Sequence, residues 1–190
     1  MQSGTQVEFR TLLSKEEYTR LVAKFKKISK FDVQTNHYFD TSTFSLKALD
    51  ASLRVRELAN LLELNLRRKK GYNIQDFRQT ITREEFNAAK EEGILPQGQV
   101  HNEIESLLGE RKLENFMSIS TKRICFRYNK GVIFIDETTY LNITDYELDY
   151  EAETLHEGKK EFIQLVKDFQ IRYRKTEKKI KRAYDALKDL

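Results

Sequence analysis

Alternating charged side chains in strand-like segments are the feature that most limits how this chain can fold. Arg54 and Arg56 stand two residues apart in one segment, and Glu147, Asp149 and Glu151 repeat that spacing in another. Residues two apart in a β-strand point to the same face. One strand therefore presents a row of guanidinium groups and another a row of carboxylates. If both rows line one enclosed space, that space can hold a phosphate chain together with its metal ions.

Strands dominate the expected secondary structure, and helices connect some of them. Ser14 and Glu17 have the spacing of a helix-starting capping box, and so do Thr82 and Glu85. The single proline, Pro96, ends the second of these helices. The expected strands are 6–13, 33–40, 51–57, 61–69, 73–81, 113–128, 132–139 and 143–154, and the expected helices are 14–28, 82–92, 101–109, 157–170 and 176–190.

This order of elements predicts an α+β fold with a mostly antiparallel sheet. Many of the strands alternate, yet few of their polar rows are simple lysine-rich solvent faces. A closed barrel with a polar interior would use both faces of such strands. No repeat, low-complexity stretch or linker interrupts the 190 residues, so a single domain spanning 1–190 is expected.

Composition narrows the possible locations and partners. The formal net charge is only +4, from 34 basic and 30 acidic residues, which is too small to indicate a nucleic-acid-binding protein by itself. Cys125 is the only cysteine, so no intrachain disulfide can form. The first residues, 1–6, lack the apolar core of a signal peptide, and the apolar run 132–135 is too short to cross a membrane. We expect a cytoplasmic protein with no membrane partner.

Arg54 and Arg56 are the first candidate binding residues. A guanidinium group presents a fork of donors that matches phosphate geometry, so paired arginines suit phosphate binding. The alternative is a solvated strand face, but lysine is the more common choice there. Arg67, Arg123 and Arg127 add further arginines at strand positions.

The acidic row of Glu147, Asp149 and Glu151 is the second candidate. Clustered carboxylates bind hard cations such as Mg²⁺ or Mn²⁺ through oxygen. The alternative is a set of salt bridges to neighbouring strands, because carboxylates on one face repel each other unless cations compensate them. Glu8 and Asp136, each in an alternating strand, could join this cluster.

Two runs of basic residues each allow two interpretations. One comprises Lys178, Lys179, Lys181 and Arg182 in the last helix, and the other spans 67–70. Each is either a solvated face or part of a binding surface. Other chemistries lack support, because the chain has no glycine-rich phosphate loop, no Cys/His zinc spacing and no GxSxG motif.

Short motifs in a particular order connect these residues to a known family. They are Asn-His-Tyr-Phe-Asp-Thr at 36–41, Leu-Arg-Val-Arg at 53–56, Leu-Glu-Leu-Asn-Leu-Arg at 62–67, Thr-Lys-Arg at 121–123, Phe-Ile-Asp at 134–136 and the acidic strand at 147–151, followed by a basic last helix. In this order they resemble the CYTH superfamily, also called triphosphate tunnel metalloenzymes. The small bacterial CYTH proteins of the Gram-positive type look most similar, and the resemblance spans nearly the whole chain.

The resemblance implies a closed eight-stranded antiparallel barrel with flanking helices, whose tunnel binds triphosphate. Family members hydrolyse inorganic or thiamine triphosphate, and one branch comprises class IV adenylate cyclases. Carried over by position, the metal ligands for Mg²⁺ or Mn²⁺ would be Glu8, Asp136, Glu147 and Asp149. The catalytic residues would be Glu8, Arg10, Glu147 and Asp149. The phosphate-binding residues would be Arg54, Arg56, Arg67, Arg123, Lys179 and Arg182.

Four positions depart from the family pattern. Gln6 stands where the first motif has a leading glutamate, and Arg10 stands where that motif has lysine. Thr80 replaces a glutamate after the fifth strand, and Glu177 replaces the first lysine of a Lys-Ser-Lys motif. A glutamine still offers a carbonyl oxygen but no charge, so Gln6 should weaken metal affinity.

Three functions follow from these expectations. The leading one is a metal-dependent hydrolase of a triphosphate-containing small molecule: inorganic triphosphate, thiamine triphosphate or a nucleotide, none favoured over the others. The second is a catalytically weakened binder or sensor of nucleotide or polyphosphate, which Gln6, Thr80 and Glu177 favour, with an adenylate cyclase-like activity as a further variant. The third is a nucleic-acid-binding module, which the near-neutral charge and the acidic strand oppose. The pattern favours no oligomeric state.

Overall fold

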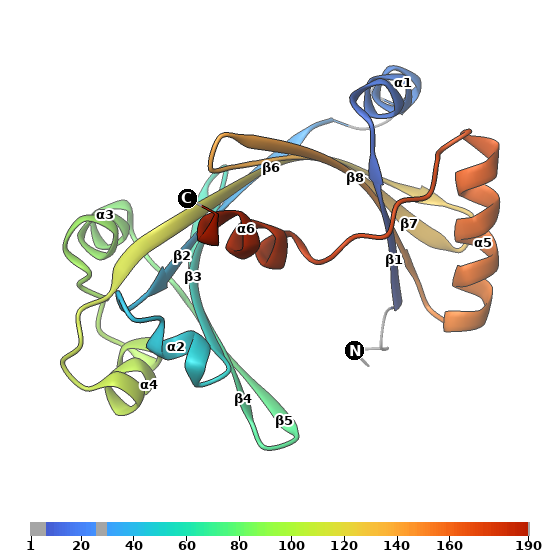
Figure 1. Ribbon diagram of the computed structural model, residues 1–190. Helices are drawn as coiled ribbons and strands as arrows, with labels where there is room; N and C mark the ends of the chain where they lie inside the picture. Colours follow the sequence, from blue (N-terminus) through green and yellow to red (C-terminus); the bar gives the residue numbers. More distant parts are fainter. Residues whose placement is uncertain (1–6, 26–29, 190) are drawn as a thin grey trace. The chain divides into compact units, whose positions relative to one another are not determined.

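A computed structural model describes residues 7–25 and 30–189 of the protein (Figure 1). The chain divides into two compact units, which are described separately below. The first unit contains Met1–Val33 and Thr121–Leu190, and the second contains Gln34–Ser120. That all of 1–190 forms one domain stays a prediction. No helix in the described ranges is both long and apolar enough to span a membrane.

Eight strands form one sheet, and hydrogen bonds join them in the order β1-β8-β7-β6-β2-β3-β4-β5. The paired strands run antiparallel, as the sequence predicts. The strands are β1 (Val7–Leu13), β2 (Asp32–Asp40), β3 (Ala51–Leu58), β4 (Leu61–Lys70), β5 (Asn73–Thr80), β6 (Glu114–Tyr128), β7 (Gly131–Tyr140) and β8 (Ile143–Ala152). The helices are α1 (Lys15–Phe25), α2 (Ser45–Ala48), α3 (Arg83–Glu92), α4 (Gln99–Leu108), α5 (Leu155–Asp168) and α6 (Lys179–Lys188).

The predicted closure of the sheet into a hydrogen-bonded barrel is wrong. β1 and β5 end the strand order, and no pairing joins them in the described ranges. A segment of the first unit occupies part of the outer edge of β1 instead. The backbone N–H of Leu12 donates to the carbonyl of Arg174 at 3.3 Å, and the backbone N–H of Arg174 donates to Thr11 Oγ1 at 2.8 Å. The backbone N–H of Leu12 is therefore not available to a further strand.

The first unit packs α1 and α5 against the apolar face of β1, β8 and β7 (Figure 1). Alternation in β8 turns Leu148 and Tyr150 toward this core, where both are fully buried. Leu21 of α1 and Leu165 of α5 fill the space beside them. The acidic residues of β8 therefore lie on the opposite face of the sheet, as the spacing in the sequence predicts.

The second unit repeats this arrangement with other elements. Leu53 and Val55 of β3 and Leu64 and Leu66 of β4 are buried beneath α3 and α4. The predicted capping box at the start of α3 is present, with Thr82 and Glu85 bonded to each other's backbone. Because the leucine and valine side chains point to the helices, the arginines between them point to the other face.

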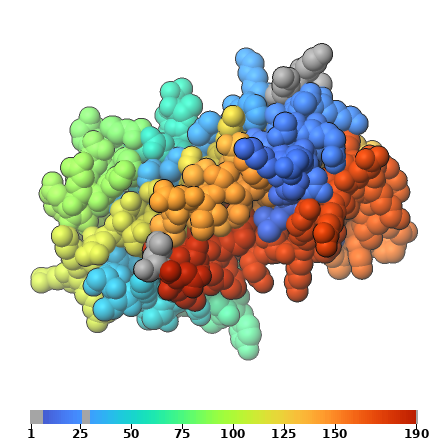
Figure 2. Space-filling model, turned by 45° about the horizontal axis from the view of Figure 1, so that its top comes forward, coloured from blue at the N-terminus to red at the C-terminus, as the bar shows by residue number. Residues whose placement is uncertain are grey.

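The last helix begins later than predicted. The periodicity predicts a start at residue 176, but α6 starts at Lys179 and residues 171–178 belong to no helix or strand. The backbone N–H of Arg172 donates to Glu17 Oε1 at 2.9 Å, and that of Arg174 donates to Thr11. These tertiary hydrogen bonds hold the connecting segment against α1 and β1. The red C-terminal segment lies directly beside the orange β7–β8 hairpin in Figure 2.

Glu17 has two structural tasks that give a testable prediction. Its side chain closes the predicted capping box with Ser14 and accepts a hydrogen bond from Arg174 Nη1 at 2.7 Å. Although burial opposes ionisation, the backbone N–H groups of Ser14 and Arg172 and the Arg174 guanidinium lower the pKa of Glu17. Glu17→Gln should therefore cost about 1–3 kcal/mol of unfolding free energy at neutral pH.

The lowered pKa also sets the pH dependence of this cost. The contribution of Glu17 is present above the ordinary value of 4.5 and is lost as the pH falls through the folded-state pKa. Urea unfolding at pH 7 and at about pH 3 measures both effects. The matched change Glu16→Gln, at the exposed neighbouring position, should shift the midpoint much less. Equal shifts for the two variants would contradict the proposed role of Glu17.

Candidate functional site

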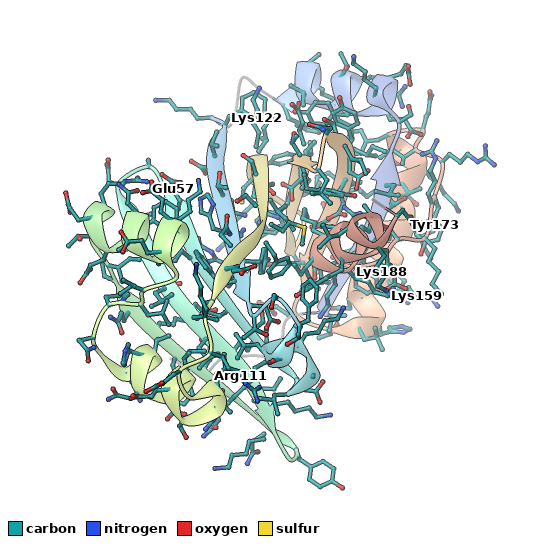
Figure 3. All side chains as sticks on the ribbon, turned by 60° about the vertical axis from the view of Figure 1, so that its left-hand side comes forward. Glu57, Arg111, Lys122, Lys159, Tyr173 and Lys188 are labelled. Atoms are coloured by element: carbon teal, nitrogen blue, oxygen red, sulfur yellow. The ribbon has the colours of Figure 1, made fainter. Side chains whose placement is uncertain are left out.

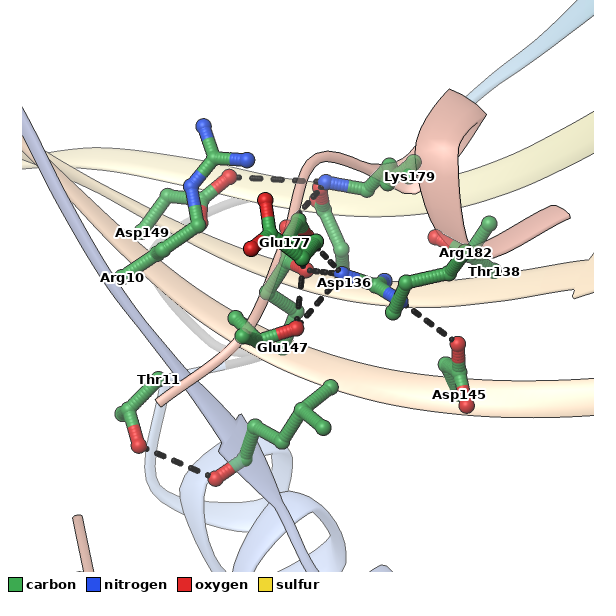
Figure 4. Close-up of polar contacts among 12 residues, drawn as sticks. Arg10, Thr11, Asp136, Thr138, Asp145, Glu147, Asp149, Glu177, Lys179 and Arg182 are labelled. Carbon is green, nitrogen blue, oxygen red and sulfur yellow. Dashed lines mark hydrogen bonds and ion pairs between the residues drawn. The ribbon is translucent and has the colours of Figure 1, made fainter. Parts of the chain in front are cut away.

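Three carboxylates meet on the polar face of the first unit (Figure 4). Glu147 of β8 lies opposite Asp136 of β7, and Asp149 of β8 lies opposite Arg10 of β1. Asp136, Glu147 and Asp149 each offer a carboxylate oxygen, and these oxygens all lie within 4.8 Å of one another. All three residues are at most 2% exposed. Carboxylates that are this close together and this deeply buried require positive charge nearby.

Lys179 supplies that charge from the first turn of α6. Its Nζ lies 2.9 Å from Asp136 Oδ2 and 3.4 Å from Asp149 Oδ2, and it also donates to Glu147 Oε1. One ammonium group therefore contacts all three members of the cluster. Lys181, two residues further along α6, is exposed and pairs only with Asp185 in the described part of the chain.

Arg182 holds the cluster from the next turn of the same helix. Its Nη1 donates to Glu147 Oε2 at 2.7 Å, and its Nε donates to Asp145 Oδ2 at 2.9 Å. Residues three apart on a helix share one face, so Lys179 and Arg182 reach the sheet together. Asp145 was not among the predicted residues, although its place two residues before Glu147 in the same alternating row was a signal for it.

Arg123 and Arg10 complete the charged face, but Glu8 stands apart from the carboxylate cluster. Arg123 of β6 binds Asp136 with two hydrogen bonds, at 2.7 and 2.6 Å, and its guanidinium lies 4.4 Å from the centroid of the Phe134 ring. Arg10 forms an ion pair with Glu8, and its Nε lies 3.9 Å from Asp149 Oδ1. The Glu8 side chain is 39% exposed, so its predicted place among the metal ligands stays a prediction.

Burial and charge move the pKa values of this cluster in opposite directions. Burial raises the pKa of Asp149 well above its ordinary value, and the neighbouring carboxylates of Glu147 and Asp136 raise it further against the pull of Lys179. Burial also opposes ionisation of Glu147, but Lys179 and Arg182 outweigh it and lower the Glu147 pKa. Burial works against the charge of Lys179 too, yet the three carboxylates raise its pKa above the usual range.

The cluster has the donors that a hard divalent cation needs. It consists only of carboxylate oxygens, which Mg²⁺ and Mn²⁺ prefer. Asp149 Oδ1 is buried and accepts no hydrogen bond from the described residues, so it has a free lone pair for a cation. Lys179 already places one positive charge against the same oxygens. A metal ion and the Lys179 ammonium would therefore compete for this cluster.

The second unit contains its own row of basic side chains. Arg54 and Arg56 lie on the polar face of β3, and the Nε atom of each is buried without a hydrogen-bond partner in the described ranges. Burial lowers the pKa of Arg56, and the positive charge of Arg54 lowers it further. Unpaired buried guanidinium donors are costly unless an anion satisfies them. This row therefore suits a phosphate group.

Other predicted residues of this unit are less enclosed. Arg67 lies on the same face of β4 but is exposed, and it sits opposite Asp76. Arg78, which the sequence reasoning did not select, lies opposite Asn65 and binds Asp76 with two hydrogen bonds, at 3.0 and 3.1 Å. The alternation of β5, with arginine among polar residues, was the available signal for Arg78.

The positions that depart from the family pattern have different environments. Thr80 lies opposite Glu63 on β4, so a carboxylate still stands at this end of the polar face. Glu177 is exposed, and its backbone carbonyl accepts a hydrogen bond from Arg182 Nη1 at 2.6 Å. Gln6 lies outside the described residues.

Comparisons with known proteins agree with these features. The family model described as "CYTH domain" matches residues 4–184. The protein "Putative triphosphatase YjbK" of Bacillus subtilis (strain 168) is 32% identical over 187 residues, which cover 97% of each chain. A crystal structure described as a "putative adenylate cyclase" from Bacillus halodurans is 31% identical, with a TM-score of 0.73 over 93% of this chain and 96% of that one.

A more distant structure has the same fold. It is described as "Putative adenylyl cyclase HpAC1 from Hippeastrum", with a dominant triphosphatase activity. It has a TM-score of 0.75 and 18% identity, and the match covers 96% of both chains. The identity is low, so this likeness supports the fold alone.

Proposed function

This chain belongs to the CYTH domain family, and we propose that it is a divalent-metal-dependent triphosphatase of a triphosphate-containing small molecule. The cluster of Asp136, Glu147 and Asp149 carries this proposal, because three buried carboxylates with oxygens within 4.8 Å form a ready site for Mg²⁺ or Mn²⁺. The name of the similar Bacillus subtilis protein supports the reaction class.

The basic residues around the cluster have a defined part in this reaction. Water attacks the terminal phosphorus and loses a proton to the solvent, the anhydride bond to the next phosphate breaks, and the leaving group departs with that bridging oxygen. A divalent ion held by Asp136, Glu147 and Asp149 would neutralise charge on the phosphates and on the attacking water. Arg123 is oriented by Asp136 and uses only two of its five N–H donors there, so the others are available to a phosphate oxygen.

We assign phosphate binding to Arg54, Arg56 and Arg67 of the second unit as well. The orphaned Nε donors of Arg54 and Arg56 support this assignment. Removing one preorganised donor from a charged transition state typically costs a factor of about 10²–10³ in turnover. Lys179 and Arg182 would bind phosphate once they are released from the carboxylates that they now contact.

A second candidate function rests on one specific observation. Lys179, Arg123 and Arg182 together place three positive charges against the three carboxylates, so much of the negative charge at this site is compensated without a divalent ion. Such a site is compatible with a binder or sensor of nucleotide or polyphosphate that no longer turns its ligand over. The similar Bacillus halodurans protein is described as a putative adenylate cyclase, so cyclase activity is a further candidate.

Phosphate release separates these functions. The purified protein is incubated with inorganic triphosphate, ATP or thiamine triphosphate, each with Mg²⁺, Mn²⁺ or a chelator. We expect metal-dependent release from at least one substrate, and we expect Glu147→Gln to reduce it by a factor of about 10² or more. Thermal stabilisation by triphosphate without release of phosphate would favour the binder, and pyrophosphate with cyclic nucleotide from ATP would favour a cyclase.

A further inference from the structure

A cavity of about 610 Å³ lies in the first unit beside the candidate site. Residues of β1, of α5 and of the segment that leads to α6 line it. Lys159 and Tyr173, both toward the right-hand side in Figure 3, belong to its wall. Its volume falls within the range of small-molecule binding sites, and the hydrolytic chemistry proposed above does not use it.

Aromatic and aliphatic side chains make the inner surface of this cavity. The rings of Phe9 and Phe162 stack with centroids 5.7 Å apart, and Tyr173 meets Phe162 edge-on at 6.4 Å. Tyr173 is 57% exposed and Ile163 is 45% exposed, although both are large apolar residues. An exposed apolar surface next to stacked rings favours a flat organic group.

The rim of the cavity is positively charged. Lys159, Lys167 and Lys175 line it, all three are exposed, and none has an ion-pair partner in the described ranges. Among the described residues that line the cavity, Glu8 is the only one with a carboxylate, and Arg10 forms an ion pair with it. A ligand with a permanent positive charge is therefore disfavoured here, while a neutral, electron-rich ring or an anion is favoured.

Two lining residues connect this cavity to the carboxylate cluster. Arg10 lines the cavity, and its Nε lies 3.9 Å from Asp149 Oδ1. Thr176 also lines it, and its Oγ1 accepts a hydrogen bond from Arg182, which holds Glu147. When the phosphates of a ligand approach the carboxylate cluster, the apolar cavity therefore lies next to them.

We propose that this cavity binds the base of a nucleoside triphosphate. This inference rests on the proposed triphosphatase function and adds the substrate class to it. Inorganic triphosphate has no group that could fill an apolar cavity. The organic group of thiamine triphosphate carries a permanent positive charge, which the three lysines repel. A nucleobase is flat and neutral, and it stacks well on aromatic side chains.

Calorimetric titration with two probes tests this proposal. One probe is an ATP analogue with a methylene bridge between the β and γ phosphates, and the other is inorganic triphosphate, both with Mg²⁺. Ile163→Asp places a carboxylate in the cavity wall at an exposed position. We expect this change to weaken the affinity for the analogue about tenfold and the affinity for triphosphate less than twofold. Tyr173→Ala should act in the same direction through lost stacking.

Leu155→Asp is the matched control, because Leu155 is a 65% exposed apolar residue of the same helix outside the cavity. It should change neither affinity. Equal weakening of both probes by Ile163→Asp, or an unchanged affinity for the analogue, would overturn the cavity assignment while leaving the triphosphatase function intact. Tighter binding of thiamine triphosphate than of the analogue would also overturn it. If neither probe binds the unaltered protein, both proposals fail.

Discussion

Lys179→Met is expected to destabilise the metal-free protein and to increase its stabilisation by Mn²⁺. The ammonium contacts Asp136, Glu147 and Asp149, and its side chain is only 20% exposed. Removing one partner from a buried ionic cluster typically costs about 3–5 kcal/mol, because the remaining charges stay uncompensated. Methionine keeps most of the side-chain volume, so the loss reports charge rather than packing.

The response to metal distinguishes this effect from general damage to α6. Without the ammonium, a divalent ion no longer has to displace a bound cation from the same oxygens. Chemical unfolding with chelator and with increasing Mn²⁺ should therefore show a larger metal-dependent gain in Lys179→Met than in the unaltered protein. Lys181→Met is the matched control on the exposed side of the helix and should behave like the unaltered protein. If Mn²⁺ stabilises all three proteins equally, the ammonium and the ion do not compete.

Arg56→Met is expected to remove most of the activity without lowering stability. The buried Nε of Arg56 has no partner among the described residues, and burial together with Arg54 lowers the Arg56 pKa. Glu63, opposite Arg56 on β4, offsets part of the cost of this charge, and a bound anion would offset more of it. Turnover should fall by a factor of about 10²–10³, while the free energy of unfolding stays the same or rises.

Paired measurements on one preparation test both halves of this expectation. Phosphate release gives the turnover, and urea unfolding in the absence of ligand gives the stability. Arg111→Met provides the control, since Arg111 is an exposed arginine of the same unit, labelled in Figure 3, and should affect neither quantity. A large loss of stability in Arg56→Met would instead make Arg56 a structural residue of β3.

Most of the secondary structure could be predicted because it depends on local patterns. The alternation in β3, β4 and β8 determines which side chains share a face. In β8, Leu148 and Tyr150 face the apolar core, and Glu147 and Asp149 lie on the other face of the sheet. The family resemblance, confirmed by the match over residues 4–184, adds Lys179 and Arg182 as candidate site residues, a role that stays a prediction.

Long-range contacts explain what the sequence could not predict. The outer edge of β1 bonds to Arg174, and β1 and β5 are unpaired in the described ranges, and nothing in the alternation of either strand indicates this. The helical periodicity of 176–190 likewise says nothing about the hydrogen bonds of Arg172 and Arg174, which hold the segment that precedes α6. Asp145 became a partner of Arg182 only through the docking of α6.

The sequence by itself determined the strands, their buried faces, the capped helices and the rows of like charge. These properties depend on residues two to four apart, whose relative directions the backbone geometry sets. Only the tertiary structure decided which charges meet. Lys179 lies 30 or more residues from Glu147 and Asp149 in the chain, and packing of α6 against the sheet brings its ammonium to their carboxylates. Ion pairs over such separations depend on where whole elements dock, and no local pattern encodes that.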